Sequence, residues 1–262
     1  MTLALICGQG HLPRIVAGTQ SRPPLVCVLR GFEPEYLPAD VTFRLEQLGT
    51  FIADLKARGV TQVCLCGAIR RPPVDPTLID AATAPLVPRL QRALTSGDDS
   101  ALRIVMTLFE EAGLKIAPVH DLVADLIPEP GIYTLKAPRS GTDDEARLGQ
   151  RTVAEMGARD VGQACVIRGS SVVAREDAAG TDAMLDRLAH GEGGILYKAP
   201  KPQQDRRADL PAIGPDTPER VAAAGLDGIV IASGGVLLLE RAKTVARCDA
   251  LGLFLWVRDA GV

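Results

Sequence analysis

The sequence predicts an α/β protein: a Rossmann-like N-terminal domain with a parallel sheet, followed by a second domain of mixed α+β type. In the first half, short apolar runs alternate with segments of helical spacing, as in a parallel sheet covered by helices. A stretch rich in proline and glycine, residues 127–141, then interrupts this pattern. Beyond it, glycine-containing turns between apolar runs favour hairpins, so strands of both directions are expected.

The elements expected in the first half end at residues typical of boundaries. Gly59 closes the second helix and Gly113 the last, since glycine adopts the left-handed conformation common after a helix. The predicted strands are residues 3–6, 25–29, 60–66 and 114–119. The predicted helices are residues 12–17, 51–58, 76–94 and 100–112.

The stretch 127–141 contains three prolines and two glycines, a composition that favours an inter-domain linker. We therefore expect a Rossmann-like domain over residues 1–130, a linker over 131–142 and a catalytic α+β domain over 143–262.

In the second half, helices and strands are expected in a less regular order. Two hairpins are predicted, one joining residues 164–167 to 171–174 and one joining 228–232 to 236–239 across Ser-Gly-Gly. Thr217 followed by Pro218 is typical of a helix start. The predicted helices are residues 143–156, 181–189, 217–224 and 242–251. The remaining predicted strands are residues 195–198 and 253–257.

Composition excludes several classes of function. With 29 basic and 32 acidic residues the net charge is −3, so no excess of positive charge favours nucleic acid as a partner. No apolar run approaches the ~18 residues of a membrane span, and the N-terminus does not resemble a signal peptide. We expect a cytoplasmic protein. Its six cysteines mostly lie in apolar runs, so they are predicted to be buried structural residues.

The first candidate binding feature is the turn Gly8, Gln9 and Gly10 between the first strand and the first helix. Small residues let a backbone approach phosphate, and a helix N-terminus offers free N–H groups. The turn lacks the third glycine of a dinucleotide fingerprint and the lysine of a P-loop, which argues against a Rossmann oxidoreductase. A generic strand-to-helix turn is an equal alternative.

Two further candidates lie in the first half. Arg70 and Arg71 follow the strand 60–66, at the sheet edge where α/β folds bind ligands, and arginine pairs clamp phosphate well. A solvated loop is the alternative. Asp98 and Asp99 precede the helix 100–112. Asp99 or Ser100 is a natural N-cap, and the other carboxylate is free to bind a divalent cation or sugar hydroxyls.

The most unusual segment is residues 198–214. Its first twelve residues hold two lysines, two arginines and two aspartates, and its prolines deny it a regular helix or strand. Asp205 and Asp209 supply hard oxygen ligands of the kind that Mg²⁺ or Mn²⁺ binds together with substrate phosphate. Such a cation neutralises charge that develops on pyrophosphate. The segment is therefore a candidate active loop.

Motifs along essentially the whole chain resemble the UDP-2,3-diacylglucosamine pyrophosphatases of the LpxI type, which serve lipid A synthesis in some Gram-negative bacteria. The specific part is the segment from Lys198 to Gly214; Gln203 departs from the glycine expected before Gln-Asp. The motifs are Gly-Gln-Gly-x-Leu-Pro from Gly8, Gly-Asp-Asp from Gly97, Lys-x-x-Lys-Pro-x-Gln-Asp-x-Arg-x-Asp-Leu-Pro-x-Ile-Gly from Lys198, and Ala-Leu-Gly-Leu-Phe from Ala250.

The resemblance implies two unlike α/β domains and Mg²⁺-dependent hydrolysis, with water attacking the phosphorus nearer the sugar. The products would be UMP and 2,3-diacylglucosamine 1-phosphate (lipid X), an intermediate of lipopolysaccharide synthesis. The family's essential aspartate maps to Asp205, with Asp209 second, and both are the expected metal ligands. The expected substrate-binding residues are Gly8, Gln9, Gly10, Arg70, Asp98, Asp99, Lys198, Lys201, Gln204 and Arg207.

A diacylated substrate also implies an apolar cleft and is compatible with peripheral contact at the cytoplasmic face of the inner membrane. A homodimer is compatible with the sequence, which does not fix the oligomeric state. Two alternatives stay open: action on a different nucleotide-sugar, and a non-catalytic nucleotide-sugar binding or regulatory module. Asp205 discriminates between catalysis and binding, because a binder has little use for a carboxylate beside pyrophosphate unless it holds a metal.

Overall fold

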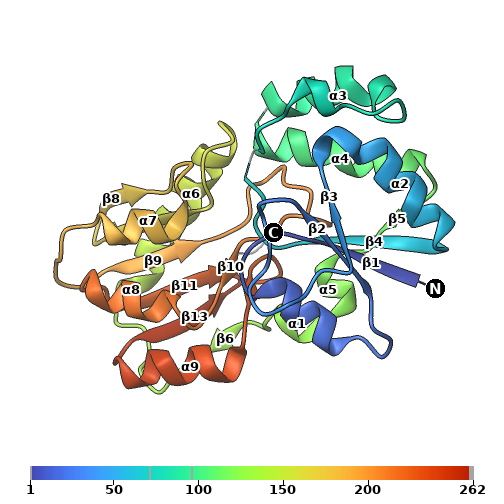
Figure 1. Ribbon diagram of the computed structural model, residues 1–262. Helices are drawn as coiled ribbons and strands as arrows, with labels where there is room; N and C mark the ends of the chain where they lie inside the picture. Colours follow the sequence, from blue (N-terminus) through green and yellow to red (C-terminus); the bar gives the residue numbers. More distant parts are fainter. Residues whose placement is uncertain (1, 71, 96, 260–262) are drawn as a thin grey trace. The chain divides into compact units, whose positions relative to one another are not determined.

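The computed structural model describes residues 2–70, 72–95 and 97–259, with Asp98 described by its backbone alone. Its contacts divide the chain into two compact units (Figure 1). Unit 1 consists of Met1–Ala124 and Asp205–Asp209; unit 2 consists of Asp125–Gln204 and Leu210–Val262. The sequence-based division into 1–130, 131–142 and 143–262 stays a prediction. It did not anticipate that five residues from the second half belong to unit 1.

Unit 1 contains a five-stranded sheet in the order β3-β2-β1-β4-β5, with every neighbouring pair parallel. This confirms the Rossmann-like layer structure predicted from alternating strands and helices. Strand β3 was not predicted, because it has three residues and only its last is buried. The strands are β1 (Thr2–Cys7), β2 (Leu25–Leu29), β3 (Val41–Phe43), β4 (Val60–Cys66) and β5 (Lys115–Ile116).

Helices cover both faces of the unit 1 sheet (Figure 1). On one face Ala4 and Ile6 of β1 pack with Phe51 and Phe109, which come from α2 and α4. On the other face lie α1 and α5. The helices are α1 (Leu12–Thr19), α2 (Leu48–Ala57), α3 (Val87–Thr95), α4 (Asp98–Glu111) and α5 (Val119–Leu122), with 3-10 turns η1 (Leu45–Gln47), η2 (Pro76–Leu78) and η3 (Ala84–Leu86).

Two expected elements of unit 1 differ from the structure because of proline. The helix expected over 76–94 is split into η2, η3 and α3, since Pro85 and Pro88 each lack an N–H and start new turns. The strand expected over 114–119 ends at Ile116, because Pro118 immediately precedes α5.

Unit 2 contains a six-stranded mixed sheet in the order β6-β13-β11-β9-β7-β8. The predicted hairpin of β7 and β8 is confirmed as an antiparallel pair. The predicted hairpin from β11 to residues 236–239 is wrong: β12 pairs in parallel with β10. Both edges of β11 are already occupied, by β9 and β13. The strands are β6 (Gly131–Ile132), β7 (Ala164–Arg168), β8 (Ser171–Arg175), β9 (Ile195–Lys198), β10 (Ala212–Ile213), β11 (Gly228–Ala232), β12 (Leu237–Leu238) and β13 (Phe254–Arg258).

A single long helix covers one face of the unit 2 sheet and three shorter helices cover the other. Ala146, Val153 and Met156 of α6 pack with Tyr197 of β9, and Gly149 allows the close approach, since a Cβ there would lie 2.5 Å from the Tyr197 ring. Residues of the three shorter helices join the opposite core. The helices are α6 (Thr142–Gly157), α7 (Gly180–Asp186), α8 (Thr217–Ala223) and α9 (Arg241–Ala250), with a 3-10 turn η4 (Ala124–Leu126).

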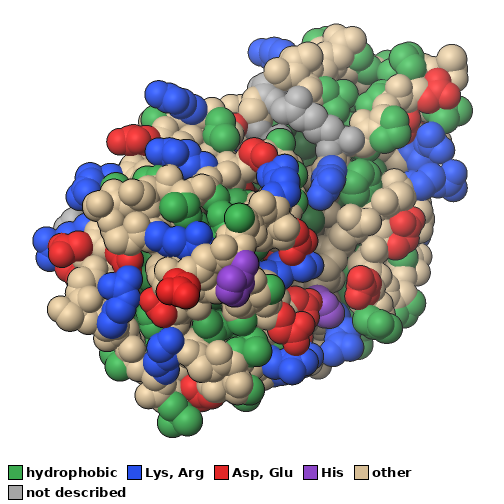
Figure 2. All heavy atoms as spheres, turned by 90° about the vertical axis from the view of Figure 1, so that its left-hand side faces the viewer, with side chains coloured by type: hydrophobic (Ala, Val, Ile, Leu, Met, Phe, Trp, Pro, Cys, Tyr) green, Lys and Arg blue, Asp and Glu red, His purple; other side chains and the backbone are tan. Residues whose placement is uncertain are grey.

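The prediction of buried, structural cysteines is confirmed, since all six are buried free thiols. Among the described helices, none is long and apolar enough to cross a membrane. Over the face drawn in Figure 2, basic and acidic side chains lie interspersed, in keeping with the small net charge.

Candidate active site

The loop between β9 and β10 carries the predicted catalytic aspartates. The backbone N–H groups of Ala208 and Asp209 both donate to the carbonyl oxygen of Asp205, at 3.3 Å. The bond from Asp209 closes a single hydrogen-bonded turn, which has Asp205 as its first residue and Asp209 as its last. Ala208 packs against the core of unit 1. An apolar contact therefore anchors the turn that carries both aspartates.

Arg207 holds the carboxylate of Asp205 in a two-pronged ion pair. Its Nε lies 3.0 Å from Oδ1 and its Nη2 lies 2.8 Å from Oδ2, and the backbone N–H of Arg207 also donates to Oδ1 at 3.1 Å. These bonds from Arg207 hold the pKa of the Asp205 carboxyl below its usual range. Only 14% of the Asp205 side chain is exposed. The residue is therefore an oriented, ionised carboxylate at neutral pH.

Helix α4 supplies the partners that receive this loop. Asp99 Oδ1 accepts from the backbone N–H of Asp205 at 3.1 Å, while Asp99 Oδ2 accepts from Arg103 Nε at 2.8 Å. Glu110 Oε1 accepts from Arg207 Nη1 at 2.7 Å. Arg103 and Glu110 follow Asp99 by four and eleven positions, which places all three on one face of the helix. The loop therefore lies along α4.

The expected N-cap role of Asp99 or Ser100 is wrong. Helix α4 begins at Asp98 with Gly97 as its N-cap, and no side chain caps it. The Asp99 carboxylate serves the loop instead, through Asp205. The side chain of Asp98 lies outside the described residues, so its predicted contact with substrate stays a prediction.

Three other predicted substrate ligands belong to unit 2 and are buried there. Lys198 Nζ donates to Thr181 Oγ1 at 2.7 Å, and Lys201 Nζ forms an ion pair with Asp160. Gln204 Oε1 accepts from the backbone N–H of Lys201 at 2.9 Å. These contacts hold the part of the loop that belongs to unit 2, up to Gln204. Their predicted contact with substrate stays untested.

The glycine turn is explained in part by a contact between loops. Gln9 pairs with Ala68 through two backbone hydrogen bonds of 2.9 Å, just after β1 and β4. A Cβ on Gly8 would lie 2.5 Å from the Ala68 carbonyl oxygen, so glycine is required for this approach. Arg70 follows in the same loop and is exposed; Arg71 lies outside the described residues. Binding of phosphate by Gly8, Gln9, Gly10 and Arg70 stays a prediction.

The donor set fits a divalent cation only if substrate completes its coordination. Within the described residues, no group of three or more His, Cys, Asp or Glu side chains could hold a metal ion. Mg²⁺ needs only one or two carboxylates when phosphate oxygens and waters supply the rest. Oδ1 of Asp205 already accepts two hydrogen bonds from Arg207, whereas Oδ2 accepts one and so keeps acceptor capacity for an ion. Asp205 and Asp209 thus suit an ion shared with a phosphate group.

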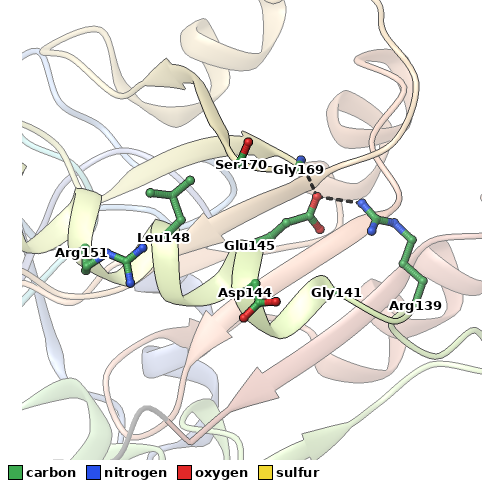
Figure 3. Close-up of a pocket in the computed structure, with 8 residues that line it drawn as sticks. All are labelled: Arg139, Gly141, Asp144, Glu145, Leu148, Arg151, Gly169 and Ser170. Carbon is green, nitrogen blue, oxygen red and sulfur yellow. Dashed lines mark hydrogen bonds and ion pairs between the residues drawn. The ribbon is translucent and has the colours of Figure 1, made fainter.

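Unit 2 contains a separate pocket of about 430 Å³ at the start of α6. Figure 3 shows the Glu145 carboxylate between Arg139 and Gly169, whose N–H groups both donate to Oε1 at 2.7 Å. Glu145 is only 2% exposed, and its Oε2 has no hydrogen-bond partner within the described residues. None of the predicted site residues whose side chains are described lines this pocket. The lining residues are Arg139, Gly141, Asp144, Glu145, Leu148, Arg151, Gly169 and Ser170.

Sequence reasoning missed Arg103 and Glu110. The available signal was the spacing of charges on α4, where Asp99, Arg103 and Glu110 share one face. That spacing is common on solvated helices. The contact between Glu110 and Arg207, almost one hundred residues further along the chain, is what links this face of α4 to the loop.

Comparison with known proteins places the chain in one family. Residues 2–126 match the family model described as the LpxI N-terminal domain, and residues 129–256 match the LpxI C-terminal domain. The chain is also 36% identical over 272 aligned residues to a Caulobacter vibrioides protein named UDP-2,3-diacylglucosamine pyrophosphatase LpxI, covering 97% of this chain and 96% of that protein. Together, the two matched domains and the full-length relative show that the chain belongs to the LpxI family.

Proposed function

We propose that this protein hydrolyses the pyrophosphate of UDP-2,3-diacylglucosamine, giving UMP and 2,3-diacylglucosamine 1-phosphate for lipid A biosynthesis. The observation that carries the proposal is similarity along nearly the whole chain to a relative named for this activity. The cluster of Asp205, Arg207 and Asp99 supports it, because it provides an ionised carboxylate and a cationic group within a few ångströms.

In this reaction the oxygen of water bonds to the phosphorus nearer the sugar, and the bond from that phosphorus to the bridging oxygen breaks. UMP leaves with the bridging oxygen, and the proton of water passes to solvent. Asp205 orients the attacking water by accepting a hydrogen bond from it, since its carboxylate is already fixed by Arg207. Arg207 acts through Asp205, because its guanidinium is paired with that carboxylate and keeps it ionised and oriented.

The proposal includes a divalent cation, Mg²⁺ or Mn²⁺, with Asp205 and Asp209 as its protein ligands. When bound, the ion supplies positive charge that neutralises the phosphate oxygens. Support comes from the single hydrogen-bonded turn that holds Asp205 and Asp209 within four residues of each other.

The proposed substrate also bears on location. The proposed location is the cytoplasm, and the two acyl chains of the substrate favour peripheral contact there with the face of the inner membrane. Exposed apolar side chains such as Leu135, 92% exposed, are compatible with such contact. A homodimer stays a prediction that the size of the protein in solution tests.

The proposal is tested by the change of Asp205 to asparagine. Asparagine keeps the size of the side chain but loses the charge that Arg207 pairs with, so we expect UMP formation to fall by about 10²–10⁴-fold. The measurement is UMP release from UDP-2,3-diacylglucosamine with Mg²⁺ and with a chelator, alongside the midpoint of thermal unfolding. We expect the chelator to abolish turnover in the wild type.

Different results separate the parts of the proposal. Full turnover in chelator would contradict the metal, and near-normal turnover of Asp205→Asn would contradict the role of Asp205. A wild-type protein that binds UDP-2,3-diacylglucosamine but cleaves no nucleotide-sugar would favour the non-catalytic binding module instead.

A further inference from the structure

Glu110 lies at the end of α4 and bonds to the loop that carries Asp205. It is three helical turns from Asp99, on the same face. Asp99 receives the backbone of the loop, through Asp205, whereas Glu110 receives a side chain, through Arg207 Nη1 at 2.7 Å. Helix α4 therefore contacts the loop at two points, and the contacts differ in kind.

Arg207 connects Glu110 to the carboxylate of Asp205. All three of its guanidinium nitrogens are used: Nη1 for Glu110, and Nε and Nη2 for Asp205. The guanidinium is planar and rigid, so the position of Nη1 sets the direction of the other two N–H groups. The orientation of the Asp205 carboxylate thus depends on where Glu110 holds the arginine.

The exposure of these side chains argues for a geometric role. Glu110 is 40% exposed and Arg207 is 44% exposed. Ion pairs exposed to this extent contribute little to stability. Removal of Glu110 also leaves two other anchors of the loop in place, the bond from Asp205 to Asp99 and the apolar contact of Ala208. Loss of Glu110 should free Arg207 without unfolding unit 1.

We propose that Glu110 is a positioning residue for hydrolysis, which acts through Arg207 to orient the carboxylate of Asp205. The inference rests on the proposed function, in which Asp205 carries the reaction. Glu110 itself bonds to Arg207 and not to the reacting atoms.

Three variants test the proposal: Glu110→Ala, Glu110→Gln and, as a matched control, Glu111→Ala. Glu111 is the next residue of α4 and also pairs with an arginine, Arg89, away from the loop. We expect kcat for UDP-2,3-diacylglucosamine to fall by about 10- to 100-fold in Glu110→Ala, because a small displacement of a reacting group is costly. KM and the midpoint of thermal unfolding should stay near the wild-type values. Glu110→Gln should recover most of kcat, since its amide oxygen accepts from Nη1, and Glu111→Ala should match the wild type.

A second readout does not depend on activity. Trypsin cleaves after Arg206 and Arg207, and the loop must open for this to occur. We expect cleavage at these two bonds, followed by mass spectrometry of the fragments, to be about three- to tenfold faster in Glu110→Ala than in Glu111→Ala.

The outcomes decide the proposal. A kcat of Glu110→Ala equal to that of Glu111→Ala, or equal losses in Glu110→Ala and Glu110→Gln together with a lower unfolding midpoint, would overturn it. Unchanged trypsin cleavage would show that Glu110 does not hold the loop. If the wild type hydrolyses no UDP-2,3-diacylglucosamine, the proposed function fails and the positioning role fails with it. If the wild type is active and Glu110→Ala keeps the wild-type kcat, the positioning role fails and the proposed function stands.

Discussion

Gly8 lies where the loop after β1 closely approaches the loop after β4. A Cβ there would lie 2.5 Å from the Ala68 carbonyl oxygen. We expect Gly8→Ala to destabilise the protein by about 1–3 kcal/mol, because backbone must move to make room. Gly18 in α1 is the matched control: its Cβ would meet nothing within 4 Å, and Gly18→Ala should be neutral or stabilise by about 0.5–1 kcal/mol.

The measurement for both glycine variants is the midpoint of urea unfolding. Equal midpoints for Gly8→Ala and Gly18→Ala would mean that the contact with Ala68 relaxes at no cost. Gly8 was predicted to bind phosphate because it lies in a strand-to-helix turn. The sequence alone does not show whether a ligand or the loop with Ala68 requires glycine at this position.

Asp99 shows the same limit at a second residue. Its place just before a helical pattern predicts an N-cap, which is the local use of an aspartate. In the structure Gly97 is the N-cap, and Asp99 bonds to Asp205 and Arg103 instead. The local pattern assigned Asp99 a capping role, whereas its observed partner Asp205 lies more than one hundred residues away in sequence.

Helix α6 offers a test of pH dependence at the scale of one element. Arg258 of β13 lies 2.7 Å from Asp143 in the first turn of α6 and holds the pKa of that carboxyl below its usual value. The folded state thus binds fewer protons than the unfolded state around the ordinary aspartate pKa of about 3.9. Asp143 contributes stability above that pH and loses it as the pH falls through its lower folded pKa.

We therefore expect Asp143→Asn to lose less stability than the wild type between about pH 6 and about pH 3. The measurement is the midpoint of urea unfolding at steps across that range. Asp144→Asn is the control, since Asp144 is the next residue of α6 and is exposed. Parallel pH curves for wild type and Asp143→Asn would show that the ion pairs of Asp143 with Arg258 and with Arg147 do not persist in solution.

Among the helices and strands, those whose pairing depends only on neighbouring residues are predicted best from the sequence. The hairpin of β7 and β8 needs only its short turn and was predicted correctly. The expected hairpin at Ser233 failed, because β11 is a central strand whose partners, β9 and β13, are both distant in sequence. Strand β6 was hidden in a proline-rich stretch, and it exists because β13 offers a free edge.

At the scale of the whole molecule, the burial of all six cysteines leads to a further prediction. Burial raises the pKa of the Cys27, Cys165 and Cys248 thiols to about 12, so thiolate is scarce at neutral pH. We expect a thiol reagent such as a nitrobenzoate disulfide to modify none of the six in the native protein within minutes, and all six in denaturant.

The control for this labelling is the rate of reaction as denaturant increases. Reaction should begin only as the protein unfolds. Rapid labelling of a cysteine in the native protein would contradict its burial.

The fold class could be predicted from the sequence, because strand–helix alternation is a local property, and the charge of residues 198–214 made that segment the candidate active loop. The membership of Asp205–Asp209 in unit 1 could not, since it depends on Ala208 entering a core built by the first half of the chain. The same holds for Glu110, whose partner Arg207 lies in that loop.

The discontinuity of unit 1 limits how this protein can recombine with its relatives. A chimera joined near residue 125 takes Asp99 and Glu110 from one parent and Asp205 and Arg207 from the other. Such a hybrid keeps each sheet intact and still brings together a loop and a helix that never evolved as partners. Substitutions at these four positions should therefore occur together among relatives. Taking residues 205–209 from the same parent as the first half should restore the contacts between the loop and α4 in a mismatched hybrid.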